Sequence, residues 1–267
     1  MRNKFLSNII VLFAISISVS INSCSTGGGI NIFSIEDDKS LGAQIDAEIL
    51  ADPTTYPILD ENDYSTAYDL LNDIRDRILA EGEVTHATDF VWKLRIIHDD
   101  DILNAFCTPG GYIYVYTGLI KYLENEAELA GVMGHEMAHA DLRHATDQLT
   151  EQYGISLLLS IVLGENSSVL TDIAQGLAGL AFSRGDESQA DEYSVIYLCP
   201  TEYYAAGAAG FFQKIEDEGG VNVPEFLSTH PNPDNRIEDI IAKYEELACP
   251  GDELFEERYA DLIDALP

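Results

Sequence analysis

The sequence predicts a mainly helical α+β domain with one small β-sheet. Three observations support this class: the chain of 267 residues is 46% hydrophobic, enough for one substantial core; several segments have the apolar spacing of helices; and two short segments alternate as strands do. We see no internal repeat and no break that indicates a second full domain. Residues 36–244 are therefore predicted to form the domain, and residues 245–267 a C-terminal extension.

The first 23 residues are predicted to be a signal peptide. Arg2 and Lys4 form a basic start, residues 9–19 form an apolar run too short to span a bilayer, and a small polar stretch leads to Cys24. The segment INSCS around Cys24 resembles a bacterial lipobox, in which the cysteine is lipidated after cleavage. Residues 24–35 are then expected to be the lipidated cysteine and a flexible tether. The alternative is an ordinary thiol just past a cleavage site.

The charge of the chain excludes some partners. Without residues 1–23, 12 Lys and Arg face 47 Asp and Glu, which gives a net charge of −35. Nucleic acid and bare anionic lipid surfaces are therefore not expected as partners. Because the acidic residues are spread along the chain, a solvated acidic surface is expected rather than an interaction tail.

Three further cysteines follow Cys24. An exported protein permits disulfides. Cys199 and Cys249, each followed by proline, are the expected pair, which leaves Cys107 free.

Two helices are expected first, over residues 41–52 and 65–82. The second is expected to begin at a cap formed by Ser65 and to stop at Gly82. Its apolar residues lie on one side, which predicts that this side packs on the core.

Two strands and a long helix are expected next. Residues 89–97 and 111–118 alternate as strands, and NAFCTPGG, residues 104–111, is expected to form the turn between them. From residue 119 to about residue 150 the pattern is helical.

The second half of the chain is predicted to be helical with one loop. Residues 155–164 are apolar on all sides but fall far short of a membrane span, so a buried helix is expected, with a membrane-dipping segment as the alternative. A further helix is expected over residues 170–198. Residues 224–237 are expected to form a proline-rich loop, and residues 236–248 a last helix.

The segment GHEMAH, residues 134–139, has the spacing of a metal chelate. Residues four apart lie one turn apart on the same helix face, so His135 and His139 can both direct a ring nitrogen to one ion about 2.0–2.1 Å away. Glu136 would lie beside the metal, placed to take a proton from a water molecule that the metal activates. The same motif also arises by chance on ordinary helices, and a third ligand would distinguish the two cases.

A catalytic zinc site needs a third protein ligand and one open position. The candidates downstream are His144, Glu151, Glu165, Glu187 and His230. On a continuous helix His144 would point about 140° away from His139, which favours a supporting or surface role. Glu187 has the better context, because it shares one helix face with Arg184 and Asp191. Glu187 could complete the site, and Asp191 could hydrogen-bond the outer nitrogen of a ligating histidine. The alternative for this trio is a solvated charged face.

Four segments in a fixed order carry a resemblance to a known family: NAFCTPGGYIYVYTGLI, GVMGHEMAHADLRH, AFSRGDESQAD and STHPNPDNRI, with a weaker opening at DDKSLGAQI. With them the chain resembles the gluzincin metallopeptidases that include the CAAX prenyl proteases, HtpX and the periplasmic BepA and LoiP proteins, the forty-eighth family of metallopeptidases. It is most similar to a minimal LoiP-like lipoprotein, since it lacks the membrane helices of the prenyl proteases and HtpX and ends too soon for the helical repeats of BepA.

The resemblance implies a zincin-like metalloprotease fold with a small sheet beside the active-site helix and one Zn²⁺ per chain. By position, it implies that His135, His139 and Glu187 bind the zinc, that Glu136 is the general base, and that Asp191 orients a ligand.

The loop that resembles the family's His-Pro motif contributes two further candidates. His230 and Arg236 are expected near the cleft, where either could stabilise the oxyanion, and His230 could instead gate the open zinc position. The alternative for His230 is a turn histidine held by Pro231.

The substrate is expected to bind beside this helix. In zinc peptidases of this kind an edge strand pairs with the substrate backbone. Residues 111–116 are expected to be that strand, with unfolded segments as the natural substrates. Asn104 and Cys107 flank the strand and are not expected to be catalytic.

These observations predict a zinc-dependent endopeptidase, lipid-anchored on the periplasmic side of a bacterial membrane, that hydrolyses unfolded or misassembled envelope proteins. The alternative is a zinc-containing, chaperone-like binding module with little proteolysis, although the intact Glu136 argues against it. A purely structural zinc site is disfavoured because three ligands and a base leave an open position.

Overall fold

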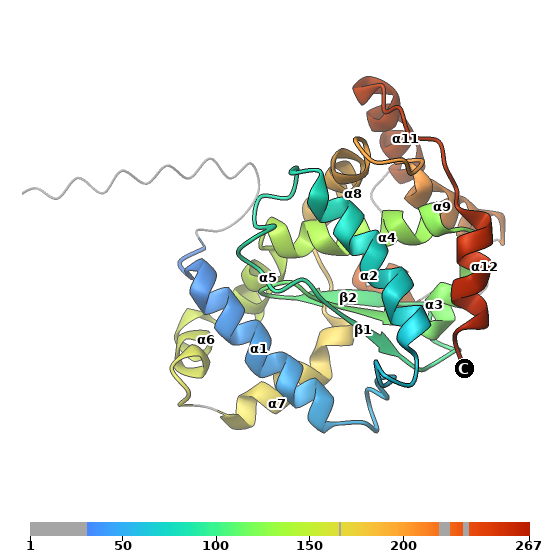
Figure 1. Ribbon diagram of the computed structural model, residues 1–267. Helices are drawn as coiled ribbons and strands as arrows, with labels where there is room; N and C mark the ends of the chain where they lie inside the picture. The colour runs from blue at the N-terminus through green and yellow to red at the C-terminus, as the bar shows by residue number, and fades with distance from the viewer. Residues whose placement is uncertain (1–30, 166, 219–224, 232–234) are drawn as a thin grey trace, which may run out of the picture.

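A three-stranded sheet separates two layers of helices (Figure 1). The computed structural model describes residues 31–165, 167–218, 225–231 and 235–267. The strands are β1 (Lys93–Ile97), β2 (Ala105–Thr108) and β3 (Tyr112–Tyr116). The helical elements are α1 (Ile35–Ala51), α2 (Ser65–Ala80), α3 (Thr117–Tyr122), α4 (Glu126–Asp141), α5 (His144–Tyr153), α6 (Ile155–Val162), α7 (Ser167–Gly176), the 3₁₀ turn η1 (Leu177–Gly179), α8 (Arg184–Leu198), α9 (Gly207–Asp217), α10 (Glu225–Thr229), α11 (Arg236–Leu247) and α12 (Glu256–Asp264). The mainly helical α+β class is confirmed.

The sheet has a mixed topology, with β3 in the centre. β1 pairs with β3 in parallel and β2 pairs with β3 antiparallel. Because successive side chains of a strand point to opposite faces, Ile113 and Val115 join a core formed with α2, α4, α8, α9 and α12, whereas Tyr114 and Tyr116 join a second core formed with α1, α6 and α7. The sheet thus divides two cores.

The position predicted for the substrate-binding strand is wrong. Residues 111–116 were expected at the edge of the sheet, but both edges of β3 are occupied by its neighbours. The segment 104–111 is also more than a turn: it contains β2, and the tight turn is confined to its end, where Gly110 and Gly111 have positive φ. The first strand begins at Lys93 rather than at residue 89, directly after Trp92, which has a φ of 44°. The two outer strands of the sheet are therefore β1 and β2, and β2 is the one that follows from the segment expected to be a turn.

The prediction of one long helix from residue 119 to about 150 is wrong as well, because this region forms three helices, α3, α4 and α5. Between α4 and α5, Arg143 adopts the left-handed conformation with a φ of 67°. Its guanidinium donates hydrogen bonds of 2.6 Å to Asp38 Oδ2 and to the backbone oxygen of Phe33, at the start of α1. These partners, which are far away in the sequence, stabilise the break between α4 and α5, and a local sequence pattern cannot show them.

Two other helix starts also differ from expectation. The helix expected over residues 170–198 is interrupted between η1 and α8, where Ser183 forms a capping box with Asp186. Ser65 is not a cap, since Tyr64 holds the N-cap position of α2 without a side-chain hydrogen bond. The helix expected over residues 236–248 is found as α11, but it is not the last one, because α12 follows it.

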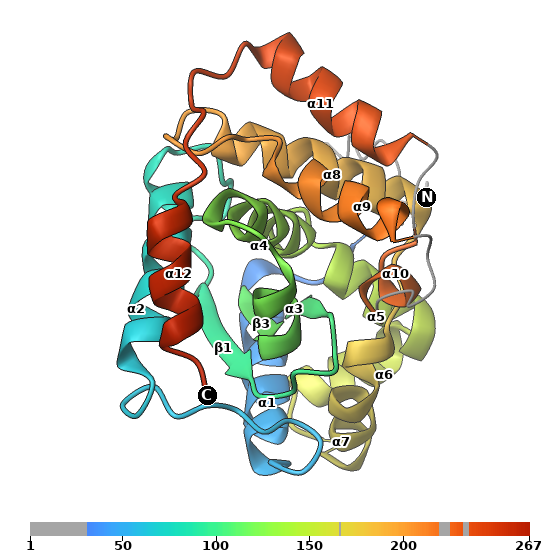
Figure 2. The ribbon, with the colours of Figure 1, turned by 90° about the vertical axis from the view of Figure 1, so that its right-hand side faces the viewer.

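Every residue of α4 is buried, because other elements surround this helix. Figure 2 shows α8, α9 and α11 on its upper side. A Cβ atom at Gly134 would lie 3.0 Å from Ser194 Oγ of α8, and one at Gly131 would lie 2.5 Å from the backbone nitrogen of Ala208 in α9. Gly134 therefore permits the close approach of α8, which carries Glu187, and Gly131 permits that of α9.

The disulfide expected between Cys199 and Cys249 is present, and Cys107 is free and buried. The bond joins the end of α8 to the segment that follows α11. The last helix, α12, packs on the same core through Tyr259 and Leu262.

Helix α6 is less buried than its composition predicts. Only Leu158 and Ile161 are buried, while Leu163 just beyond the helix is 71% exposed. The expectation of a fully buried helix is therefore wrong. Of the helices in the described ranges, none combines the length and the apolar character that a membrane span requires.

Candidate metal centre

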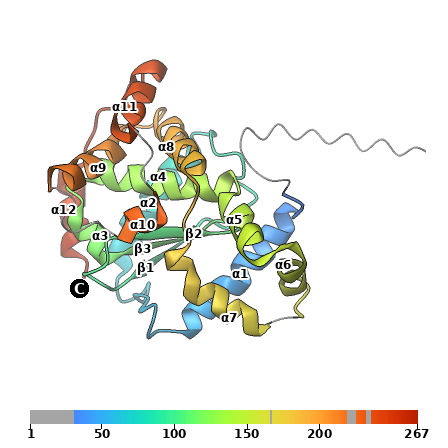
Figure 3. The same cartoon turned by 180° about the vertical axis from the view of Figure 1, so that it is seen from behind.

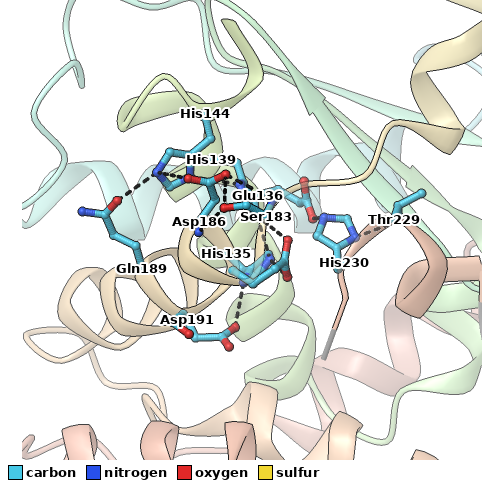
Figure 4. A network of polar contacts seen from close by, with 12 residues as sticks. His135, Glu136, His139, His144, Ser183, Asp186, Gln189, Asp191, Thr229 and His230 are labelled. Atoms are coloured by element: carbon cyan, nitrogen blue, oxygen red, sulfur yellow. Dashed lines mark hydrogen bonds and ion pairs between the residues drawn. The ribbon is translucent and has the colours of Figure 1, made fainter. Parts of the chain in front are cut away.

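Two helices bring the expected ligands together. His135 and His139 (Figure 4) lie on successive turns of α4, and Glu187 lies on α8, which packs across α4. The Nε2 atoms of the two histidines are 3.0 Å apart. Glu187 Oε2 lies 3.5 Å from His135 Nε2, and Glu187 Oε1 lies 3.3 Å from His139 Nε2. Each of these side chains is at most 2% exposed.

This geometry fits a tetrahedral metal. Ligand atoms about 2.1 Å from a tetrahedral ion lie about 3.4 Å from one another, and the three separations above are close to that value. His230 extends the group, since one ligand atom from each of His135, His139, Glu187 and His230 lies within 4.8 Å of the others. Glu187 Oε1 is buried without a hydrogen-bond partner, an arrangement that a cation would satisfy. The donor set of nitrogen and carboxylate oxygen suits zinc.

Asp191 and Arg236 support the carboxylate side of the group. His135 Nδ1 donates to Asp191 Oδ1 at 2.8 Å, which leaves the lone pair of Nε2 directed at the other ligands. Arg236, from the first turn of α11, donates through Nη2 to Glu187 Oε2 at 2.8 Å and through Nε to Asp191 Oδ2 at 2.7 Å. Its guanidinium also lies 4.0 Å from the ring centre of Phe212. Arg236 therefore neutralises two buried carboxylates.

The environment separates the pKa values of the two histidines. Burial opposes a charge on His135, but its hydrogen bonds to Asp191 and Glu187 prevail and raise its pKa to about 9. Burial lowers the pKa of His139 to about 3, since the interaction with Glu187 only partly opposes it. The pKa of Glu187 is held well below its usual value despite burial, by the histidines around it. Without metal, His135 is therefore expected to carry a proton on both ring nitrogens and a positive charge near neutral pH, while His139 stays neutral.

Glu136 and His230 face each other across the site. His230 Nε2 lies 3.2 Å from Glu136 Oε1, within ion-pair distance, but neither that nitrogen nor either Glu136 oxygen has an aligned hydrogen-bond partner among the described residues. Burial acts to raise the pKa of Glu136, and the neighbouring His230 outweighs it, so that the pKa is lowered. Glu136 is thus an ionised carboxylate directed at the group of ligands.

Helix α10 fixes the ring of His230. Figure 3 shows α10, in orange, just below α4. The imidazole stacks on Phe226 with ring centres 4.1 Å apart, and its Nδ1 lies 3.2 Å from the backbone oxygen of Phe226 and 2.9 Å from Thr229 Oγ1. A proton on Nδ1 satisfies the backbone oxygen and leaves the lone pair of Nε2 free to face the ligands.

Phe182 covers the site from another direction. It lies between η1 and α8 and stacks on His139 with ring centres 3.8 Å apart. Its backbone nitrogen donates to the backbone oxygen of Thr229, which joins the two covering segments. No sequence pattern indicates this role, because a lone phenylalanine before a serine cap resembles any core residue. The site is closed from solvent in this conformation.

The structure brings most of the predicted site residues together: His135, Glu136, His139, Glu187, Asp191 and His230 converge. Arg236 was expected near the cleft, where either it or His230 could stabilise the oxyanion. Its Nε and Nη2 atoms lie beside the ligands but donate to the carboxylates of Asp191 and Glu187. Cys24 lies outside the described residues.

Comparison with known proteins extends these findings. Residues 69–243 match the model of the family described as Peptidase family M48. The chain is 31% identical over 184 residues to the "Beta-barrel assembly-enhancing protease" of Yersinia pestis, which covers 63% of this chain and 37% of that protein. It is 30% identical over 161 residues to the "Mitochondrial metalloendopeptidase OMA1" of Arabidopsis thaliana, covering 59% and 32%.

A shorter relative aligns over more of its own length. The "Metalloprotease YcaL" of Escherichia coli (strain K12) is 28% identical over 168 residues, which is 60% of this chain and 65% of that protein. The chain thus spans about a third of the two longer relatives and about two thirds of this one.

Proposed function

Because this chain belongs to peptidase family M48, a family of metallopeptidases, we propose that it is a zinc-dependent endopeptidase of the bacterial cell envelope whose substrates are unfolded or misassembled envelope proteins. The observation that carries the proposal is the convergence of three ligand atoms with an ionised Glu136, whose oxygens have no hydrogen-bond partner among the described residues, in one buried site. His135, His139 and Glu187 would hold the zinc.

The chemistry needs one metal and the groups around it. Zinc, when bound, supplies a Lewis acid that polarises the scissile carbonyl and lowers the pKa of a water molecule. Glu136 takes the proton of that water and later delivers it to the leaving amine. Asp191 and Arg236 keep His135 and Glu187 oriented during this exchange, because both carboxylates are bound at fixed positions.

An extended peptide would bind along β2. This strand lies at the outer edge of the sheet and packs against α4, the helix that carries Glu136. Backbone pairing along such an edge is independent of sequence, which suits unfolded clients. Asn104 Nδ2 donates to the backbone oxygen of Ala178, so η1 lies at one end of this edge.

His230 would be a fourth group able to hold the zinc while the site is closed, and it would have to withdraw to admit substrate. The support is its Nε2 atom, which is buried, unpartnered and within ligand distance of the group. Withdrawn from the metal, the same nitrogen could donate to the oxyanion.

Replacing His230 with alanine tests this role. We expect zinc to be retained, because three ligands remain, and the rate of peptide cleavage to change by at least about tenfold, downward if oxyanion stabilisation dominates and upward if release from closure dominates. The measurement is steady-state cleavage of a fluorogenic peptide together with zinc content. Unchanged activity and unchanged zinc occupancy would show that His230 is only a turn residue.

The N-terminal segment supports a proposal for where the protein is located in the cell. Residues 1–23 have the pattern of a signal peptide, and Cys24 stands where a lipidated cysteine would stand. The disulfide between Cys199 and Cys249 suits an oxidising compartment. We therefore propose that the protein is held by a lipid anchor on the periplasmic side of a bacterial membrane. Relatives named for β-barrel assembly are consistent with this location.

The alternative is a chaperone-like module that holds envelope proteins with little proteolysis. One observation favours it, namely that the site is closed from solvent. Retention of Glu136 with both oxygens unpartnered favours hydrolysis, since a binding module does not need a buried carboxylate.

Removal of the metal tests the proposed function. We expect the purified protein to contain one zinc per chain, to lose cleavage of casein when a chelator removes the zinc, and to regain it when zinc is restored. Hydrolysis depends on the metal because no other described group at the site is a comparable Lewis acid. Casein cleavage that persists in demonstrably zinc-free protein would refute the assignment.

A further inference from the structure

His144 orients a zinc ligand without touching the site of the metal. We propose that His144 is a positioning residue which accepts a hydrogen bond from His139 and, through its other nitrogen, donates one to Gln189. The proposal deepens the proposed function and rests on it, because it concerns how His139 is held for zinc.

The distances define a chain of three side chains. His139 Nδ1 lies 3.1 Å from His144 Nδ1, and His144 Nε2 lies 3.0 Å from Gln189 Oε1 (Figure 4). If His139 gives the lone pair of Nε2 to the metal, its proton must be on Nδ1, so His144 must accept at Nδ1. A neutral His144 then carries its proton on Nε2, opposite the amide oxygen of Gln189. Only one arrangement of protons satisfies all three residues.

His144 is enclosed beside the ligand, since its side chain is only 5% exposed. The nearest carboxylate, Asp186, lies 3.9 Å from Nε2, farther than the amide oxygen of Gln189. The hydrogen-bond partner of Nε2 is therefore the amide of Gln189 rather than a carboxylate.

The break between α4 and α5 makes the contact possible. On one continuous helix His144 would point about 140° away from His139. The left-handed Arg143 reverses the chain and returns His144 to the same side, at the first residue of α5. The ring of His139 is then held between Phe182 on one side and His144 at its edge.

The two histidine ligands consequently have different partners. His135 donates to the carboxylate of Asp191, whereas His139 donates to a neutral imidazole. A carboxylate partner raises the basicity of a ligating histidine. His139 therefore gives its lone pair to the metal less strongly than His135 does, and its binding of zinc depends more on the orientation of its ring.

Two variants of His144 separate the hydrogen bond from the volume of the ring. His144→Leu removes the acceptor, and His144→Asn places an amide oxygen where Nδ1 stood. The matched control is His98→Leu, at an exposed histidine. By chelator competition, we expect His144→Leu to weaken zinc binding roughly 10- to 100-fold, and His144→Asn and His98→Leu to stay within about threefold of the wild type. The thermal unfolding of each metal-free variant shows whether it folds.

Two further readouts distinguish positioning from packing. The visible spectrum of the Co²⁺-substituted protein should change in His144→Leu and be restored in His144→Asn, and kcat of the zinc-saturated Leu variant should fall while KM stays near the wild-type value. Equal zinc affinity and equal spectra in the wild type and His144→Leu would overturn the proposal, as would a loss of affinity that His144→Asn does not rescue.

The tautomers can be tested in the wild type alone. Long-range ¹⁵N–¹H correlation spectra of the zinc-loaded protein should place the proton of His139 on Nδ1 and that of His144 on Nε2. The reverse assignment for His144 would overturn the proposal while zinc binding and peptidase activity stand. A wild type that binds no zinc would overturn both this proposal and the proposed function.

Discussion

Replacing Glu136 with glutamine is expected to lower the rate of peptide cleavage by at least about 10²- to 10⁴-fold, the usual contribution of a general base. The carboxylate is fully buried, and the contact that the structure gives its oxygens is with His230 Nε2, 3.2 Å from Oε1 and without hydrogen-bond alignment. Glutamine has the same shape but cannot take a proton from water. We therefore expect the variant to keep its fold and its zinc, and the measurement is single-turnover cleavage of a peptide beside the metal content.

The same variant separates the two candidate functions. If the protein is an endopeptidase, Glu136→Gln should still bind an unfolded envelope protein but should no longer degrade it. Glu151→Gln is the matched control, because Glu151 is exposed on α5, and it should behave as the wild type. Degradation that continues at the wild-type rate in Glu136→Gln would rule out the mechanism proposed for this site.

Replacing Arg236 with leucine is expected to destabilise the metal-free protein by about 3–5 kcal/mol, the cost of leaving a buried charge unpaired. The Arg236 side chain is 1% exposed and donates to Glu187 and to Asp191, both of which are buried. The free energy of unfolding, measured by denaturant titration, should fall most in the absence of zinc. With zinc, part of the loss should be offset, because the cation also neutralises Glu187.

An exposed ion pair provides the control for Arg236. Lys39 pairs with Glu36 on the surface of α1, and Lys39→Leu should change the stability by less than about 1 kcal/mol. Arg236→Lys should be intermediate, since lysine keeps the charge but cannot bind two carboxylates with one planar fork. If Arg236→Leu proves as stable as Lys39→Leu, the guanidinium does not balance these carboxylates.

The sequence predicted the ligands because each set lies within an unbroken helix. His135, Glu136 and His139 belong to α4, and Glu187 and Asp191 belong to α8, so the spacing of four residues translated directly into a shared face. The family motif then supplied the link between the two helices, which spacing alone could not.

The parts that the sequence did not predict depend on contacts between distant segments. Arg143 interrupts the helix because of Asp38 and Phe33, more than 100 positions earlier. The same break places His144 beside His139, so a rotation calculated for one helix gave the wrong direction. The order of the strands is a further case: alternation identifies a strand but does not determine its neighbours.

The division of the core by the sheet bears on how this protein can change over time. The ligand helices pack on one face, whereas α1, α6 and α7 pack on the other, where Tyr114 and Tyr116 separate them from the ligands. Substitutions and insertions in α6 and α7 can accumulate with little effect on the positions of the histidines. In the layer that faces away from the metal, α6 and α7 are thus free to diversify, whereas α1 is constrained by the contact of Asp38 with Arg143, and the other layer by the geometry of catalysis.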